Sequence, residues 1–162
     1  MPAEFDAVMA GVDYPVVVVT TVHPRTGEPS GCLAGFVTQC SIHPPLLLVC
    51  LSTSNHTYRV ARSARSLAVH LLEPDRDDLA ALFGAVTGDE VDKFAACQWR
   101  PGPDGLPLLD GCPRWLAGPV LRCVPLGDHV GFVLEPNAFG AGGHGPALMF
   151  SAVRDLPAGH EA

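Results

Sequence analysis

The chain has 162 residues, of which 48% are hydrophobic and 17% charged, and its formal net charge is −7. This length suits one domain with one core, and the apolar content excludes a disordered chain. The acidic balance, without a cluster of Lys or Arg, argues against nucleic acid and anionic membranes as partners, because both bind through basic side chains. No apolar run reaches the ~18 residues of a membrane span, and we expect no secretory signal, since no basic stretch precedes an apolar one at the N-terminus.

From the N-terminus, residues 4–10 place apolar side chains on one face and predict a short helix. The β-branched run at 15–22 predicts a buried strand, and the Pro- and Gly-containing segment 23–29 predicts a turn. An extended segment at 31–41, interrupted by glycines, comes next. The apolar run at 46–52 predicts another strand.

Further along, residues 52–57 are almost all N-cap residue types, and a helix is predicted directly after them at 58–64. A strand is predicted at 66–72. Apolar residues at spacing i, i+3, i+4 and i+7 predict a helix over 76–86, and a further helical turn is predicted at 90–95.

The last third begins with a segment at 99–111 that holds three Pro and three Gly, which predicts a loop. Strands are predicted at 116–124, 129–134 and 147–153. The sum is six or seven strands and three short helices, without the regular alternation of a parallel sheet. We therefore predict a mainly β (α+β) fold of a single domain over 1–162, an antiparallel barrel with helices packed outside.

The six cysteines lie far apart in the sequence, and several fall in apolar, strand-like runs. No C-x-x-C pair or Cys/His cluster has the spacing of a zinc site. We expect buried, reduced thiols and no bound metal. Together with the absence of a secretory signal, this predicts a cytoplasmic location.

Residues 140–145 match the pattern G-x-G-x-x-G of dinucleotide-binding turns. The context does not fit, because Pro146 and a strand-like run follow where a helix would be needed to face a pyrophosphate. We therefore expect a flexible loop here.

Three other features leave alternatives open. The polar residues at 52–57 suit a phosphate site at a helix start, but on local grounds a plain N-cap by Ser54 or Asn55 is favoured. The segment 31–45 combines glycines with polar side chains, so a flat heteroaromatic ring against it and a kinked strand with a bulge are equally supported. His129 follows Gly-Asp, and on local grounds a turn residue without chemistry is favoured.

Taken together and in order, these segments resemble the flavin-reductase-like family, whose members adopt the FMN-binding split barrel. The resemblance runs from about residue 8 to residue 150. Six motifs carry it: Gly31–Pro45, Ser54-Asn-His-Thr57, Leu67–Leu72, Lys93-Phe94, Gly105–Gly111 and Gly127-Asp128-His129.

This resemblance implies an antiparallel split β-barrel with a few short helices outside, assembled as a homodimer. It implies one FMN or FAD per subunit near the dimer interface, with NAD(P)H as co-substrate. The activity implied is that of an NAD(P)H:flavin reductase, whose reduced flavin reduces a second flavin or leaves for a monooxygenase partner. NAD(P)H would pass hydride to the flavin, and the protein would supply mainly position and electrostatics.

By resemblance, His129 meets the nicotinamide, and Lys93 lies in the phosphate or ribityl region. The residues expected along the isoalloxazine and ribityl chain are Gly35, Phe36, Val37, Thr38, Gln39, Cys40 and Ser41. The residues expected at the phosphate are Ser54, Asn55, His56 and Thr57.

The chain departs from the family pattern at Leu33, Gly35, Phe36 and Gln39, where hydroxyl residues are usual, and at His70, where Asn is usual. Fewer hydroxyls would face the flavin. Three alternatives therefore stay open: a flavin-binding electron carrier or store without reductase activity, an oxidoreductase with another flavin-like cofactor such as a deazaflavin, and a barrel that has lost its cofactor.

Overall fold

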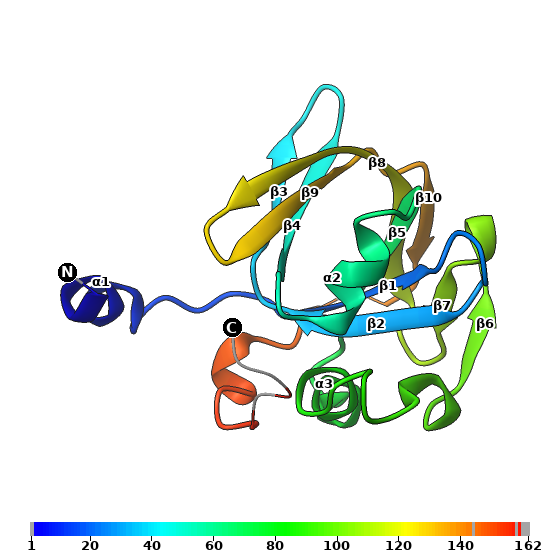
Figure 1. Ribbon diagram of the computed structural model, residues 1–162. Coiled ribbons are helices and arrows are strands. Elements are labelled where there is room, and N and C mark those ends of the chain that lie inside the picture. The colour runs from blue at the N-terminus through cyan, green and yellow to red at the C-terminus, as the bar shows by residue number, and fades with distance from the viewer. Residues whose placement is uncertain (1, 144, 158, 160–162) are drawn as a thin grey trace.

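The computed structural model describes residues 2–143, 145–157 and 159, and its body is a strongly curved antiparallel sheet (Figure 1). The strands of this sheet are β1 (Val17–Val22), β2 (Pro29–Ala34), β3 (Val37–Ser41), β4 (Leu46–Ser52), β5 (Ser66–Leu71), β8 (Arg114–Leu126), β9 (His129–Leu134) and β10 (Ala138–Ala141). They follow the order β2-β1-β5-β8-β9-β4-β3, and β10 pairs with β8 beside this path. A separate hairpin consists of β6 (Trp99–Pro101) and β7 (Pro107–Leu109).

The two ends of the sheet are joined by the chain itself. β2 pairs with β1 at one end of the path and β3 pairs with β4 at the other, yet only Gly35 and Phe36 separate β2 from β3. The amide of Cys50 in β4 donates to the carbonyl of Phe36 at 2.9 Å and fixes this bend. The predicted antiparallel sheet is confirmed. Hydrogen bonds do not close it into a barrel, because the chain leaves β1 at the bend and pairs with β4 instead.

The three predicted helices are present, with their ends shifted by a few residues. They are α1 (Pro2–Met9), α2 (His56–Ala61) and α3 (Asp77–Gly84). α2 packs on β1 and β2, α3 packs on β2, and α1 extends away from the body without burying any of its residues (Figure 1). Within the described part of the chain, no helix has the length and apolar character needed to cross a membrane.

β1 is buried on both faces, which explains its continuous run of valines. Val17 and Val19 point into the curve of the sheet and pack with apolar residues of β4 and β9. Val16 and Val18 point to the opposite side, where Phe83 of α3 covers them. Successive residues of a strand face opposite sides, so a strand that is buried on both faces shows no alternation of apolar and polar residues.

The extended segment predicted at 31–41 is interrupted at Gly35, where the structure divides it into β2 and β3. Two other predictions along the chain are wrong. The predicted loop at 99–111 contains the β6–β7 hairpin, in which Pro101 lies opposite Pro107. Proline has no N–H to donate to a neighbouring strand. The β6–β7 hairpin is short and has only two strands, so it tolerates the missing hydrogen bonds.

The predicted strand at 147–153 is also wrong. Met149 makes one isolated bridge to Pro15, and a 3-10 turn covers Phe150–Ala152. Leu148 and Val153 are buried in the layer under α3. The apolar pattern of this segment therefore reflects side chains packed against α3, and the backbone does not pair as a strand. The G-x-G-x-x-G match at residues 140–145 begins in β10 at Gly140, and no helix follows it within residues 145–149. The structure thus agrees with the expectation that this match is not a dinucleotide-binding turn.

His70 in β5 is fully buried and ties three strands together. Its Nδ1–H donates to the carbonyl of Val18 at 3.1 Å, and its Nε2 accepts the amide of Leu109 at 3.2 Å. Burial is the main cause that lowers the pKa of His70 to about 4. The imidazole is therefore neutral at physiological pH, with one nitrogen donating and the other accepting.

Because the folded pKa of His70 is about 4 and the reference pKa is 6.5, the unfolded chain binds a proton between these values that the folded chain does not. The contribution of His70 to stability is thus complete above pH 6.5 and is lost as the pH falls toward 4. We expect the stability advantage of the wild type over His70→Asn to shrink by roughly 3 kcal/mol from pH 7 to pH 4. Urea unfolding at a series of pH values measures it, and parallel stability curves for the two proteins would contradict it.

Candidate functional site

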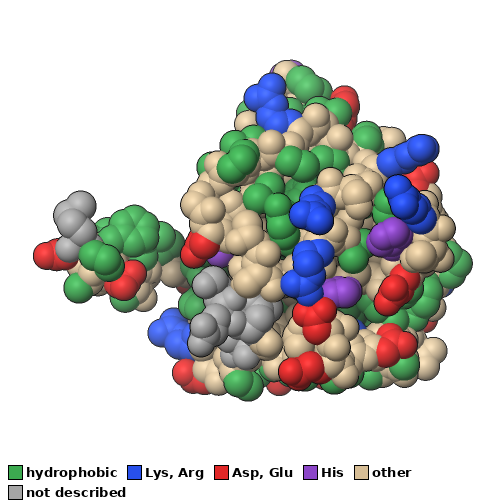
Figure 2. Space-filling view, in the orientation of Figure 1, with side chains coloured by type: hydrophobic (Ala, Val, Ile, Leu, Met, Phe, Trp, Pro, Cys, Tyr) green, Lys and Arg blue, Asp and Glu red, His purple; other side chains and the backbone are tan. Residues whose placement is uncertain are grey.

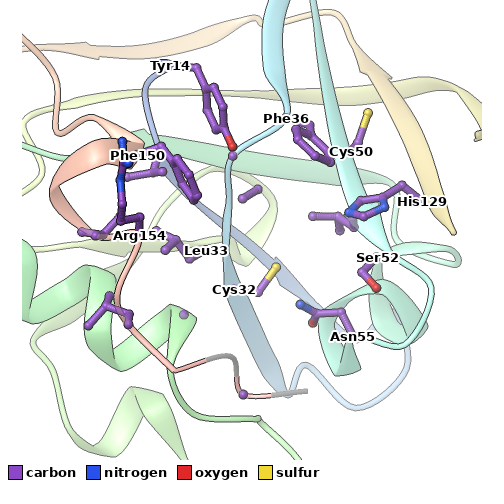
Figure 3. A pocket seen from close by; sticks show the side chains of 18 of the residues that line it. Tyr14, Cys32, Leu33, Phe36, Cys50, Ser52, Asn55, His129, Phe150 and Arg154 are labelled. Atoms are coloured by element: carbon purple, nitrogen blue, oxygen red, sulfur yellow. The ribbon is translucent and has the colours of Figure 1, made fainter. Parts of the chain in front are cut away.

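A cavity of about 350 Å³ opens between β2, β4 and the C-terminal segment after Leu148 (Figure 3). Its volume lies in the range of roughly 300–1,000 Å³ that is typical of small-molecule sites. The wall on one side comes from the Gly35–Phe36 bend, so the feature that joins the two ends of the sheet also shapes the cavity.

Four aromatic rings follow the rim of this cavity. Tyr14 stacks on Phe150 with ring centroids 4.9 Å apart and an interplanar angle of 14°. Phe36 lies 6.3 Å from Tyr14 and 5.0 Å from the imidazole of His129, both in tilted contacts. The rings come from four separate segments and form a continuous arc that suits a flat, conjugated ligand.

Gly35 lets Tyr14 occupy its place in this arc. A Cβ on Gly35 would lie 2.9 Å from Cε2 of Tyr14, closer than side chains normally approach. Any residue other than glycine would push the Tyr14 ring away. Glycine at position 35 therefore suits the tyrosine that lies against it.

Two cysteines, Cys32 and Cys50, also line the cavity. Burial raises the pKa of Cys32 to about 11, and burial also raises that of Cys50. Both thiols therefore stay protonated at neutral pH and act as small apolar groups rather than nucleophiles.

Polar groups gather where β4 ends and β9 begins. Ser52 and Asn55 line the cavity, and Asn55 caps α2 by accepting the amide of Thr57 at 2.8 Å. His129 lies opposite Ser52 in the β4–β9 ladder, directly after the turn at Gly127–Asp128.

The imidazole of His129 is oriented by its neighbour in sequence. Nδ1 of His129 lies 2.7 Å from the carboxylate of Asp128, and this hydrogen bond is the main cause that lowers the pKa of Asp128. The carboxylate is ionised and accepts the Nδ1–H, so Nε2 is the nitrogen left to meet a ligand.

Of the site residues expected from the sequence, the structure places Gly35, Phe36, Asn55 and His129 around the cavity. Ser54 lies beside it, with its hydroxyl 2.9 Å from that of Ser52.

Thr57 and His56 face other partners. The hydroxyl of Thr57 is buried 2.9 Å from that of Ser30. Nδ1 of His56 lies 2.9 Å from the Asp89 carboxylate, in a separate polar cavity of about 280 Å³.

Lys93 is almost fully buried beneath this region, at 5% exposure. Its Nζ donates to the carbonyls of Gly31 and Phe83, at 3.1 Å each. Burial lowers the pKa of Lys93. A cavity of about 30 Å³ lined by Lys93 and Asn55 lies between the polar cavity and the larger one.

The five expected residues of β3 lie elsewhere. The side chains of residues 38–40 are exposed, and those of Thr38 and Gln39 bond to carbonyls within β3 itself. These five, which do not line the main cavity, are Val37, Thr38, Gln39, Cys40 and Ser41. Their role as flavin contacts stays a prediction.

Several cavity residues were not found by sequence reasoning. Tyr14, Phe150 and Arg154 carry no motif. Tyr14 lies more than a hundred positions from the other two, and no local pattern indicates that they meet. The sequence predicted the cysteines only as buried, reduced thiols and did not indicate that Cys32 and Cys50 line the cavity.

Comparison with known proteins connects this fold and cavity with a family. The model of the flavin reductase like domain matches residues 9–156. A probable flavin reductase of Rhizobium meliloti (strain 1021) is 34% identical over 123 residues, which are 76% of this chain and 39% of that protein. The reductase subunit HsaB of a flavin-dependent monooxygenase from Mycobacterium tuberculosis (strain CDC 1551 / Oshkosh) is 29% identical over 79% of this chain and 66% of its own length.

A solved structure agrees with these relatives. The NADH:FAD oxidoreductase SgcE6 of Streptomyces globisporus C-1027 superposes with a TM-score of 0.83 at 26% identity, over 93% of this chain and 89% of that one. The same oxidoreductase has also been solved in complex with NAD and FAD fragments, with a TM-score of 0.80 at 26% identity over 93% and 88% of the two chains.

The chain belongs to the flavin reductase like family. It spans well under two thirds of the first of these relatives, so the activity, substrates and partners of the whole protein are proposals.

We expect Gly35→Ala to displace Tyr14 and lower the free energy of unfolding by about 1–3 kcal/mol, as other overpacked sites do. Gly11→Ala is the matched control, because a Cβ there meets nothing within 4 Å, and its effect should stay within about 0.5 kcal/mol. Urea unfolding measures both. If Gly35→Ala destabilises a Tyr14→Ala background as strongly as the wild type, the clash with Tyr14 is not the cause.

Proposed function

We propose that this chain is an NAD(P)H:flavin oxidoreductase that binds FMN or FAD in the cavity between β2 and β4. The observation that carries this proposal is the arc of aromatic rings around a cavity with few polar groups, in a member of the flavin reductase like family.

The residues present fit a flavin. The aromatic and aliphatic walls suit an isoalloxazine ring, and the cavity has polar groups from Ser52, Asn55 and His129 at one end. Ligand sites of this type combine apolar walls with a small number of placed polar groups. A bound flavin would supply the hydride-accepting chemistry, taking hydride from NAD(P)H and leaving NAD(P)⁺.

The phosphate of the flavin would lie at residues Ser54–Thr57, where backbone amides begin α2. Lys93 supports this placement, because its ammonium is buried against two carbonyls and the Phe83 ring and has no carboxylate partner among the described residues. A buried, uncompensated cation is costly, and a nearby anion would offset that cost. The small cavity shared by Lys93 and Asn55 connects this charge with the main cavity.

His129 would orient the nicotinamide. Asp128 holds the Nδ1–H, so Nε2 is available to accept a hydrogen bond from the carboxamide of NAD(P)H. Phe36, packed against the imidazole, would exclude water from the place where the two rings meet.

We expect the purified wild type to bind FMN or FAD and to oxidise NADH or NADPH when flavin is added. His129→Ala should raise KM for the pyridine nucleotide about tenfold, the value of one lost hydrogen bond, and leave the Kd for flavin within about twofold. His23→Ala, in the β1–β2 turn and outside the cavity, is the matched control.

Two results would contradict this proposal in different ways. Tight flavin binding without NAD(P)H oxidation favours the electron carrier or flavin store. A wild type that binds no flavin at all points to a different cofactor or to a barrel without one.

We also propose that the chain forms a homodimer and delivers reduced flavin to a monooxygenase in the cytoplasm. The apolar face of α1 supports the homodimer, because Phe5, Val8 and Met9 are 67%, 75% and 41% exposed on a helix that stands apart from the body (Figure 2). The name of the relative HsaB supports the monooxygenase, and six free cysteines suit a reducing compartment.

We expect the wild type to have twice the chain mass of 17.0 kDa in light scattering. Phe5→Asp combined with Val8→Asp should shift it toward the monomer, because two charges cannot be buried in an apolar interface without partners. Ala7→Asp, which adds charge to the opposite face of α1, is the control. A wild type with the mass of one chain would contradict the homodimer.

A further inference from the structure

The C-terminal segment 148–157, here called the C-terminal strap, is fixed beside the cavity by specific contacts. The amide of Phe150 donates to the carbonyl of Tyr14 at 2.8 Å. The amide and hydroxyl of Ser151 donate to the carboxylate of Asp13 at 3.0 and 2.5 Å. The strap is therefore a built wall of the cavity rather than a loose end.

The strap places one cation on the cavity. Arg154 is the single Lys or Arg among the described residues that line it (Figure 3). Within the described part of the chain, its guanidinium makes no hydrogen bond or ion pair, although its charge helps to lower the pKa of Asp13. The carboxylate of Asp13 already accepts from Ser151 and from the amide of Tyr14, which leaves the donors of Arg154 for a ligand.

Arg154 also lies at the end of the aromatic arc. The arc begins at His129, continues through Phe36 and Tyr14 and ends at Phe150 on the strap, with centroid separations of 5.0, 6.3 and 4.9 Å. A ligand that fits it has flat rings and an anionic group on the side of the strap. The proposed flavin phosphate lies at the other end, beside Asn55, so the strap side is left for a second ligand.

We propose that Arg154 binds a phosphate of the pyridine nucleotide, while Tyr14 and Phe150 provide the surface for its adenine. This inference rests on the proposed function and deepens it, because it names the residues of the strap that recognise the co-substrate. Arg suits this task, since its planar guanidinium offers two parallel donors to phosphate oxygens.

The test measures binding directly. Calorimetry gives the Kd for NAD⁺ of the full chain saturated with FMN, at low salt and at 0.5 M salt. We expect Arg154→Gln to weaken NAD⁺ binding at low salt about fivefold, the upper range for an exposed ion pair. Arg154→Lys should recover part of the loss, and the wild type should lose more affinity with salt than Arg154→Gln does.

Arg122→Gln is the matched control, because Arg122 is exposed on β8 and lines none of the cavities described above. It should bind NAD⁺ like the wild type. Repeating the titration with NADP⁺ separates the two phosphate sources: an equal loss for both nucleotides assigns Arg154 to the pyrophosphate, and a larger loss for NADP⁺ assigns it to the 2′-phosphate.

Two results overturn the inference. Either NAD⁺ and NADP⁺ bind Arg154→Gln as tightly as the wild type, or the Kd for FMN rises in Arg154→Gln while that for NAD⁺ does not, which would assign the cation to the flavin. Failure of the proposed function looks different, because then the wild type itself neither binds the nucleotide nor oxidises it.

Discussion

The bend at Gly35–Phe36 is the constraint on which the rest of the structure depends. It carries the chain from β2, at one end of the sheet, to β3, at the other, so the sheet must curve until its two ends meet. That curvature brings β2 and β4 to opposite sides of one cavity. A hydrogen-bonded ladder between β2 and β3 would have filled the gap that the bend leaves open.

Although the chain is acidic, few charged side chains lie near the cavity. Lys93 lies buried beneath one end and Arg154 lies on the strap at the other, while Asn55, Ser52 and His129 provide further polar atoms. Cations placed singly at two ends of an apolar-walled cavity suit two separate anionic groups better than one. The proposed hydride transfer between stacked rings would require mainly position, which such a cavity would provide without a dedicated acid or base.

Local patterns predicted the parts of the fold where one physical cause dominates. The valines of β1 indicated a strand because branched side chains favour extended backbone, and the spacing from Leu79 to Val86 indicated α3 because one helical face must be buried. Prediction failed at 99–111, where Pro and Gly occupy a hairpin, and at 147–153, where apolar residues dock without pairing. In both segments composition describes burial or turn content but not backbone partners.

The sequence by itself determined the antiparallel sheet, its helices and, through ordered motifs, the family. It also indicated Gly35, Phe36, Asn55 and His129, because motifs mark them locally. Only the tertiary structure decided that Tyr14, Phe150 and Arg154 complete the same cavity. The physical reason is that their meeting depends on the strap docking against residues more than a hundred positions away, and such long-range contacts leave no periodic signal in the chain.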